Sequence, residues 1–212
     1  GNIALDEAVK FLTNEQLHES ETAYRTGLEI IGHMYKRIQE YKERTGLKFT
    51  IEETPAESAT RRFAKVDLRN YPTEAGSVIR NKDEPAYTNS IHYAPGAPVG
   101  LVDRIVGQSK FHTMIESGAI VHAWVGEKRP STEFIASTVK NTLEETNCSQ
   151  LVFSPTYTEC DACGNIMQGE KSLCNNPNCR NNRSETMDPD KGVYPVTRIV
   201  GYNSRIKNWN DS

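Results

Sequence analysis

The chain has 212 residues, of which 25% are charged and 36% hydrophobic, and its formal net charge is −3. This composition is ordinary for a globular protein with one large domain, or one domain and a small module. The weak negative charge argues against a nucleic-acid or anionic-membrane partner. Because no apolar run approaches the roughly 20 residues of a membrane-spanning helix, we expect no membrane association and a cytoplasmic location.

The first fifty residues are predicted to be mainly helical. Residues 4–12 form a short helix, and Thr-Asn-Glu-Gln at 13–16 offers a capping box for a long helix that ends near Thr45. A four-three apolar spacing predicts the buried face of that helix: Tyr24, Leu28, Ile31, Tyr35 and Ile38. Gly46 is placed to end it. Alternating apolar residues over 47–51 then predict a strand.

The next segment, Thr54-Pro55-Ala56-Glu57, has a structural and a functional interpretation. As local structure, Thr54 is the N-cap, Pro55 the first residue and Glu57 the third residue of a helix. A strand that leads into a helix N-terminus is also a common place for α/β proteins to bind anions and substrates. Glu57 is therefore a candidate active-site residue, with a helix cap as the alternative.

The remaining elements alternate along the chain. A polar stretch over 67–85 is predicted to be a long surface connection. After it we expect strands at 86–92, 119–125 and 150–154 and helices at 99–116 and 131–145. This alternation favours a mostly parallel α/β arrangement. His92 has no partner at metal-ligand spacing, so we interpret it as a structural histidine.

Four of the five cysteines are close together in the sequence. Cys160 and Cys163 form a CxxC pair, and Cys174 and Cys179 form a second pair. Four thiolates at such spacing suit a tetrahedral Zn²⁺ site without an open position, which is a structural site. An iron–sulfur cluster is the alternative. Metal ligation rather than disulfide bonding fits a reducing cytoplasm, and Cys148 stands apart from the cluster.

Near the C-terminus a single glycine interrupts a β-branched run, in Arg198-Ile199-Val200-Gly201-Tyr202. Taken alone, such a glycine indicates a bulge, a tight bend or a close backbone approach. Glycine also lacks a Cβ, so its Cα can become planar and share an unpaired electron with the flanking amides. The pentapeptide by itself does not separate these two interpretations.

In combination, these motifs resemble the C-terminal region of the anaerobic (class III) ribonucleotide reductases, which are glycyl-radical enzymes. The shared features, in the family's order, are Thr-Pro-Ala-Glu at 54–57 with the basic stretch 61–65, Thr-Asn-Ser at 88–90, the four cysteines and Arg-x-x-Gly-Tyr at 198–202. They extend over nearly the whole chain. One departure is the four-residue gap between Cys174 and Cys179, where the family more often has two residues.

The resemblance implies a fold and an activity. The fold is the C-terminal part of a ten-stranded α/β barrel over 1–155, a four-cysteine zinc module over 156–191, and a glycyl-radical loop and tail over 192–212. The reaction is the reduction of ribonucleoside triphosphates to 2′-deoxyribonucleoside triphosphates. In it Gly201 carries a radical, formed by a separate activase that uses S-adenosylmethionine and an iron–sulfur cluster. The radical generates a cysteine thiyl that attacks the 3′ position of the substrate.

The family's thiyl cysteine lies on a finger loop upstream of the region matched here, and Cys148 has no such context. The chain also begins at Gly1, without a methionine or a signal peptide. We therefore expect a C-terminal part of the enzyme, separately encoded, cleaved or taken from a longer chain. Its partners would be the N-terminal half with the finger-loop cysteine, the activase and the ribonucleotide, in a homodimeric assembly.

Two other functions remain as alternatives. The first is a non-catalytic zinc-module protein that binds nucleic acid or a protein partner, with phosphate contacts from Lys191, Arg198, Arg205 and Lys207. The balanced charge and the lack of an aromatic-basic patch disfavour it. The second is another glycyl-radical enzyme, such as a formate-lyase relative, which is disfavoured because the cysteine cluster fits the reductases better.

Overall fold

The protein is described here by a computed structural model that covers residues 1–54, 56–126, 128–188, 190–198 and 203–206. Two compact units divide these residues. The first unit contains Gly1–Val121 and Ser137–Leu151, and the second contains His122–Ala136 and the described part of Val152–Trp209. Together they form a mixed α/β protein. Among the described residues, none of the helices combines the length and apolar character that a bilayer crossing requires.

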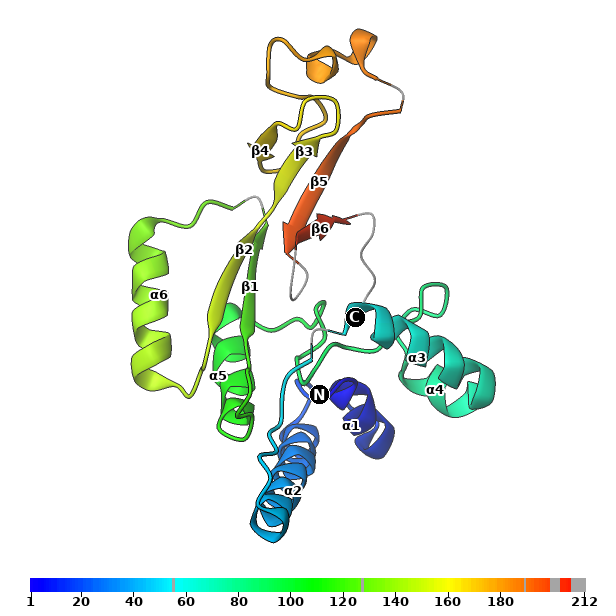
Figure 1. Ribbon diagram of the computed structural model, residues 1–212, viewed down its shortest axis with the longest axis vertical. Helices are drawn as coiled ribbons and strands as arrows, with labels where there is room; N and C mark the ends of the chain where they lie inside the picture. Colours follow the sequence, from blue (N-terminus) through cyan, green and yellow to red (C-terminus); the bar gives the residue numbers. More distant parts are fainter. Residues whose placement is uncertain (55, 127, 189, 199–202, 207–212) are drawn as a thin grey trace. The chain divides into compact units, whose positions relative to one another are not determined.

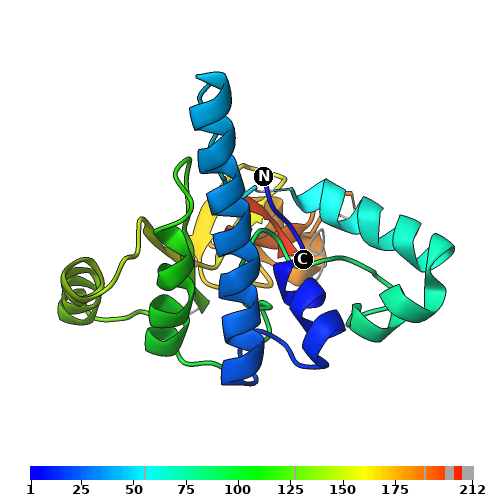
Figure 2. The same ribbon diagram turned by 90° about the horizontal axis from the view of Figure 1, so that it is seen from below.

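The first unit is mainly helical (Figure 1). Its helices are α1 (Leu5–Thr13), α2 (Glu21–Thr45), α3 (Glu57–Asn70), α4 (Pro72–Val78) and α5 (Leu101–His112). Figure 2 shows α1 beside the long α2, and α3 and α4 as consecutive helices of one pair. The side chains of Val9, Leu17, Ile31 and Phe111 are almost completely buried in one apolar core. This core joins the first helices to α5.

The ends of α2 follow from local chemistry. The Ser20 hydroxyl accepts a hydrogen bond from the Ala23 N–H at 3.2 Å, so Ser20 is the N-cap. At the other end Gly46 has φ 70° and its N–H donates to the Lys42 carbonyl, as predicted for a C-terminal glycine. The prediction of a capping box at 13–16 is wrong, because Thr13 is the last residue of α1 and its hydroxyl donates to the Val9 carbonyl at 2.8 Å.

The strands predicted at 47–51 and 86–92 do not form. The structure has isolated bridges instead, in which Asn2 pairs with Glu53 and Ile3 pairs with Asn89. Alternation alone does not make a strand, because a strand needs a hydrogen-bonded neighbour along its length. Over 47–51 it does not mark a buried face either, since Leu47 is 63% and Phe49 38% exposed while Ile51 is buried. The prediction of a surface connection over 67–85 is also wrong. That segment contains the end of α3 and all of α4, with Pro72 at the start of α4.

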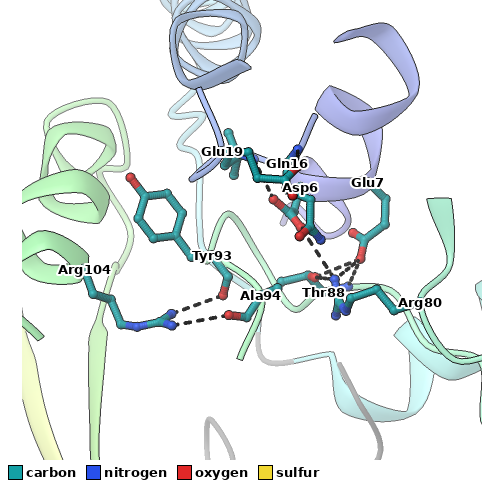
Figure 3. Close-up of polar contacts among 10 residues, drawn as sticks. Asp6, Glu7, Gln16, Glu19, Arg80, Thr88, Tyr93, Ala94 and Arg104 are labelled. Carbon is teal, nitrogen blue, oxygen red and sulfur yellow. Dashed lines mark hydrogen bonds and ion pairs between the residues drawn. The ribbon is translucent and has the colours of Figure 1, made fainter. Parts of the chain in front are cut away.

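Buried carboxylates connect α1 to distant parts of the first unit (Figure 3). One oxygen of Glu7 accepts hydrogen bonds from the Thr88 N–H at 3.0 Å and the Thr88 hydroxyl at 2.8 Å. Arg80 lies 3.1 Å from that oxygen and 3.5 Å from a carboxylate oxygen of Asp6. The Leu17 N–H donates to Asp6 at 2.9 Å. Burial raises the pKa of both carboxyls, and the nearby Arg80 opposes this shift.

The second unit is built on strands. Strands β1 (Val121–Gly126) and β2 (Leu151–Pro155) are hydrogen-bonded neighbours, and all but the first residue of each belongs to this unit. Between them in the chain is α6 (Thr132–Glu145), whose residues from Ser137 onward are assigned to the first unit. A second sheet has the order β4-β3-β5-β6, with bounds β3 (Tyr157–Cys160), β4 (Ile166–Gln168), β5 (Val193–Arg198) and β6 (Asn203–Arg205). The predictions of β1, β2, α5 and α6 are therefore confirmed, with shifted ends. The four-stranded sheet, whose strands were not predicted from the sequence, is antiparallel throughout.

Two helical glycines offer a matched test of the packing in the first unit. A Cβ added at Gly107 in α5 would lie 2.1 Å from the hydroxyl oxygen of Tyr93, whose side chain is buried. At Gly32 in α2 the nearest atom would be the Met114 sulfur, at an ordinary 3.7 Å. We expect Gly107→Ala to lower the thermal unfolding midpoint, because overpacking costs about 1–3 kcal/mol.

In the control, Gly32→Ala should keep or raise the midpoint, because alanine favours a helix over glycine by about 1 kcal/mol. Differential scanning calorimetry measures both variants. Equal midpoints for the two variants would contradict the close approach of Tyr93 to α5.

Candidate metal centre and radical segment

The first cysteine pair lies on the turn between β3 and β4. Cys160 is the last residue of β3, and its carbonyl accepts the Gly164 N–H at 2.8 Å while its N–H donates to Asn165 at 3.0 Å. Gly164 has φ 70°, a left-handed conformation that glycine adopts at little cost. The tight turn keeps Cys163 close to Cys160. A CxxC sequence with glycine next is therefore folded here as a metal-binding knuckle would be.

The second pair is closed by asparagines. The Cys174 N–H donates to the Asn181 carbonyl at 2.8 Å, and the Asn182 side chain donates to the Cys174 carbonyl at 2.8 Å. The Cys179 N–H donates to the Asn176 carbonyl at 3.0 Å. These bonds fold the longer CxxxxC spacing into a compact loop. The departure from a two-residue gap therefore does not prevent the two thiols from approaching one site.

All five cysteines lie within the described residues and are free thiols. The four clustered sulfur atoms lie within 4.8 Å of one another. The distance is 3.7 Å between Cys160 and Cys179, and 3.6 Å between Cys163 and Cys174. Sulfurs around a tetrahedral Zn²⁺ with Zn–S bonds of about 2.3 Å lie about 3.8 Å apart, whereas a disulfide needs about 2.05 Å. The four residues can therefore hold a metal ion.

The surroundings shift the pKa values of these thiols in different directions. Burial raises the pKa of Cys174, and although the Asn181 N–H opposes the shift, burial and the other cysteines raise the pKa of Cys179 to about 12. The Asn165 N–H lowers the pKa of the Cys163 thiol to about 7. The Asn176 N–H lies 3.4 Å from the Cys174 sulfur. Each further thiolate at this distance repels the others, so four thiolates need a compensating cation. The donor set and its surroundings suit a divalent metal.

Asn181 is part of this centre, although sequence analysis did not identify it. Its side chain is completely buried and points its amide nitrogen at the Cys160 sulfur, 3.6 Å away. The same amide donates to the Lys191 carbonyl, and its oxygen accepts the Asp188 N–H at 2.8 Å. The only signal in the sequence is the high density of asparagines around Cys179. Such side chains orient metal ligands through hydrogen bonds.

Gly201 lies in segment 199–202, outside the described residues. The strands on either side of this segment are described, and they pair Arg198 of β5 with Asn203 of β6. The Trp124 indole N–H donates to the Arg198 carbonyl at 3.3 Å. β5 also pairs with β3, whose last residue is Cys160. One antiparallel sheet therefore contains Cys160 of the first cysteine pair and the two strands adjoining the Gly201 segment.

Glu57 is the first residue of α3, and its side chain lies outside the described residues. The N-cap is Ala56, which has no side-chain capping bond, so the prediction of Thr54 as N-cap and Glu57 as third residue is wrong. The Ala56 N–H donates instead to the Asn89 side chain at 3.1 Å. Glu57 belongs to the first unit and the four cysteines to the second.

Comparison with known proteins identifies the family. The family model described as anaerobic ribonucleoside-triphosphate reductase matches residues 1–212. The chain belongs to this family. The enzyme of that name from Enterobacteria phage T4 is 33% identical over 94 residues, which are 44% of this chain and 15% of the relative. The Escherichia coli enzyme is 27% identical over 123 residues, or 58% of this chain and 17% of the relative.

Solved structures of reductases share the fold. A structure titled anaerobic ribonucleotide reductase superposes with a TM-score of 0.74 at 18% identity and covers 96% of this chain. The structure of the Thermotoga maritima reductase with glycerol in the active site also superposes with a TM-score of 0.74, at 17% identity, and covers 96% of this chain. This chain covers 29% and 30% of those two structures. The chain therefore spans less than a third of the length of the reductases to which it is similar.

Within the reductase fold, the first unit buries a carboxyl that sequence analysis did not identify. Burial raises the pKa of Glu53 to about 8, although the Ile120 N–H donates to its carboxylate at 2.7 Å. Burial lowers the pKa of His92 to about 4, as it does for His112. The His92 Nε2 and the nearer Glu53 oxygen are 3.8 Å apart. At neutral pH both side chains are therefore uncharged, and their contact is not an ion pair.

This burial predicts a pH dependence of stability. In the unfolded chain Glu53 loses its proton near pH 4.5, whereas in the folded chain it keeps the proton until about pH 8. The folded state thus binds more protons across this window, so the free energy of unfolding decreases as the pH rises. The slope reaches about 1.4 kcal/mol per pH unit for one such group. We expect Glu53→Gln to reduce the slope of the unfolding midpoint between pH 5 and 8.

The control is Glu52→Gln at the exposed neighbouring position. It removes one carboxylate without changing a buried group, so its profile should follow that of the unmodified chain. The measurement is thermal unfolding followed by circular dichroism at a series of pH values. If Glu53→Gln and Glu52→Gln gave the same profile, Glu53 would not be protonated in the folded state.

Proposed function

We propose that this chain is the C-terminal, glycyl-radical-bearing part of an anaerobic ribonucleoside-triphosphate reductase, which forms 2′-deoxyribonucleoside triphosphates. The main support is that one antiparallel sheet carries Cys160 of the cysteine centre and the two strands that adjoin Gly201. The family match over the whole chain supports the same proposal. The mixed α/β fold fits a piece of the ten-stranded barrel. On this proposal the barrel part is 1–155, the metal module 156–191 and the radical loop 192–212.

Gly201 performs the radical step in this proposal. It takes a hydrogen atom from a cysteine thiol on the N-terminal half, so that an S–H bond breaks and a Cα–H bond forms at Gly201. The thiyl then attacks the 3′ position of the ribonucleotide. The pairing of Arg198 with Asn203 fixes the two chain ends between which Gly201 lies. Glu57, at the start of α3, is a further candidate active-site residue, because it is part of the Thr-Pro-Ala-Glu segment that resembles the family's motif.

The cysteine centre is proposed to hold Zn²⁺ through Cys160, Cys163, Cys174 and Cys179. Bound zinc would supply the positive charge that four thiolates require. All four thiols fill the tetrahedron, so the site leaves no position for substrate and serves to fix the local fold. The sulfur distances of 3.6 and 3.7 Å support this choice.

The partners follow from the proposal. They are the N-terminal half with the finger-loop cysteine, a radical S-adenosylmethionine activase, the ribonucleotide and a second copy in a homodimer. The short coverage of the curated relatives, 15% to 17% of their length, supports the need for an N-terminal segment. A nucleic-acid-binding zinc module is not favoured, because the family match covers the first unit as well as the cysteines.

We predict one zinc per chain, measured by elemental analysis of anaerobically purified protein. Cys160→Ser should abolish zinc retention, because it removes one of four ligands. Cys148→Ser is the matched control, since Cys148 is buried in the first unit beside Ile105 and Val121. Its zinc content should be unchanged. If the protein contained iron and no zinc, and showed visible charge-transfer absorption, the site would be an iron–sulfur cluster instead.

We further predict that anaerobic activation produces an electron paramagnetic resonance doublet from Gly201. The unpaired electron couples chiefly to the one remaining α-hydrogen, so deuterated glycine should collapse the splitting. Gly201→Ala should abolish the signal and leave the zinc content intact, because a methyl group obstructs the planar radical. Gly96→Ala is the control, because a Cβ there meets no atom within 4 Å.

The same samples test whether nucleotide reduction requires both this chain and the N-terminal half of the enzyme. Nucleotide reduction should require the N-terminal half, because the thiyl cysteine is expected there. A doublet that persists in Gly201→Ala would move the radical to another residue. Turnover by the chain alone would place the catalytic cysteine within it.

A further inference from the structure

A charged side chain connects the strand after the Gly201 segment to the first cysteine pair. Arg205 is the last residue of β6 and forms an ion pair with Asp161, which lies between Cys160 and Cys163. A second carboxylate, that of Glu159, lies 3.9 Å from the same guanidinium nitrogen. All of these residues belong to the second unit. Arg205 is therefore held by the cysteine turn from a position four residues after Gly201.

The sheet register explains how Arg205 reaches this turn. Arg205 is opposite Val196 of β5, and Glu159 of β3 is opposite Tyr194 of β5. Tyr194 and Val196 are two residues apart, so their side chains share one face of the sheet. The guanidinium lies 4.3 Å from the centre of the Tyr194 ring. Arg205 thus crosses β5 diagonally over Tyr194 to the acidic residues at the end of β3.

The contact is more constrained than a surface ion pair. The side chains of Asp161 and Arg205 are only 24% and 28% exposed. The Asp161 backbone is fixed as well, because its N–H donates to the Gly192 carbonyl at 3.1 Å. An exposed pair with two flexible side chains contributes little, whereas a stacked and partly buried pair holds its geometry. The position of Asp161 also depends on the turn that presents Cys160 and Cys163.

We propose that Arg205 is a positioning residue that couples metal binding at the four cysteines to the placement of β6 and of the chain that leads into it. A metal ion fixes the Cys160–Cys163 turn, the turn fixes Asp161, and Asp161 holds Arg205. The catalytic consequence, correct placement of Gly201, rests on the function proposed above. The coupling itself does not. By linkage, loss of the Arg205 contact weakens metal binding by the factor by which metal strengthens the contact.

The test compares Arg205→Met with Arg180→Met in the whole chain. Arg180 follows Cys179 directly and pairs with Asp188 at 3.0 Å, so it is an ion pair beside the other cysteine pair. Hydrogen–deuterium exchange of residues 203–206 is measured with and without zinc, and zinc affinity is measured by competition with a chelator. Zinc should slow this exchange in the unmodified chain, and Arg205→Met should speed it roughly three- to tenfold in the zinc-bound protein.

Arg180→Met should leave the exchange of 203–206 unchanged. Arg205→Lys should restore part of the protection, because it keeps the charge but not the planar stacking on Tyr194. In a double-mutant cycle, Asp161→Asn should add little to Arg205→Met. Equal exchange in Arg205→Met and Arg180→Met, or no effect of zinc on 203–206 in the unmodified chain, would overturn the proposal.

Radical yield separates this proposal from the proposed function. At a saturating zinc concentration, where the site is filled in both proteins, Arg205→Met should reduce the electron paramagnetic resonance signal, and Arg205→Lys should recover part of it. If the unmodified chain gives no radical but the exchange results hold, the proposed function fails and the coupling stands. If the unmodified chain and Arg205→Met give the same radical yield, Arg205 has no positioning role.

Discussion

The second unit depends on a close approach of four sulfur atoms that would repel one another as thiolates. Its buried apolar cluster consists of Cys160, Met167, Cys174 and Cys179, so the ligands themselves replace a hydrophobic core. The rest of the segment is polar and supplies hydrogen bonds to sulfur and to the loop backbone. On the proposed assignment of a metal to these cysteines, metal binding and the folding of this segment would be coupled. β3, which ends at Cys160, pairs with β5, and β5 pairs with β6. A fixed position of Cys160 therefore also restricts the positions of β5 and β6.

The first unit meets a different constraint, because it buries ionisable groups that, among the described residues, are not clustered as metal ligands. Glu53 and His92 are both kept uncharged by burial, although they lie close together. Arg104 is also buried, and its guanidinium donates to the Tyr93 and Ala94 carbonyls (Figure 3). These bonds satisfy backbone carbonyls of a buried segment that forms no strand among the described residues. In this unit, hydrogen bonds from polar side chains satisfy backbone carbonyl groups. In the second unit, hydrogen bonds between strands do so.

The sequence allowed prediction of features that depend on neighbouring residues. The apolar stripe of α2, its end at Gly46 and the two cysteine pairs each follow from local spacing. Tertiary features were missed or misassigned. The apolar alternation over 47–51 predicted a strand, but among the described residues the segment has no neighbouring strand with which to pair. The polar residues over 67–85 predicted a surface connection, whereas α4 begins there at Pro72. The roles of Asn181 and Arg205 depend on partners that only folding brings near.

The carboxylates of α1 have a consequence for the order of folding. Glu7 lies in α1, yet its main hydrogen-bonding partner, Thr88, is 81 residues later in the chain. Until that segment arrives, water solvates Glu7 better than the protein can, so α1 gains little by docking early. Contacts of such long range carry a large chain-closure entropy and slow folding. The N-terminal helix should therefore be among the last elements of the first unit to take its native place.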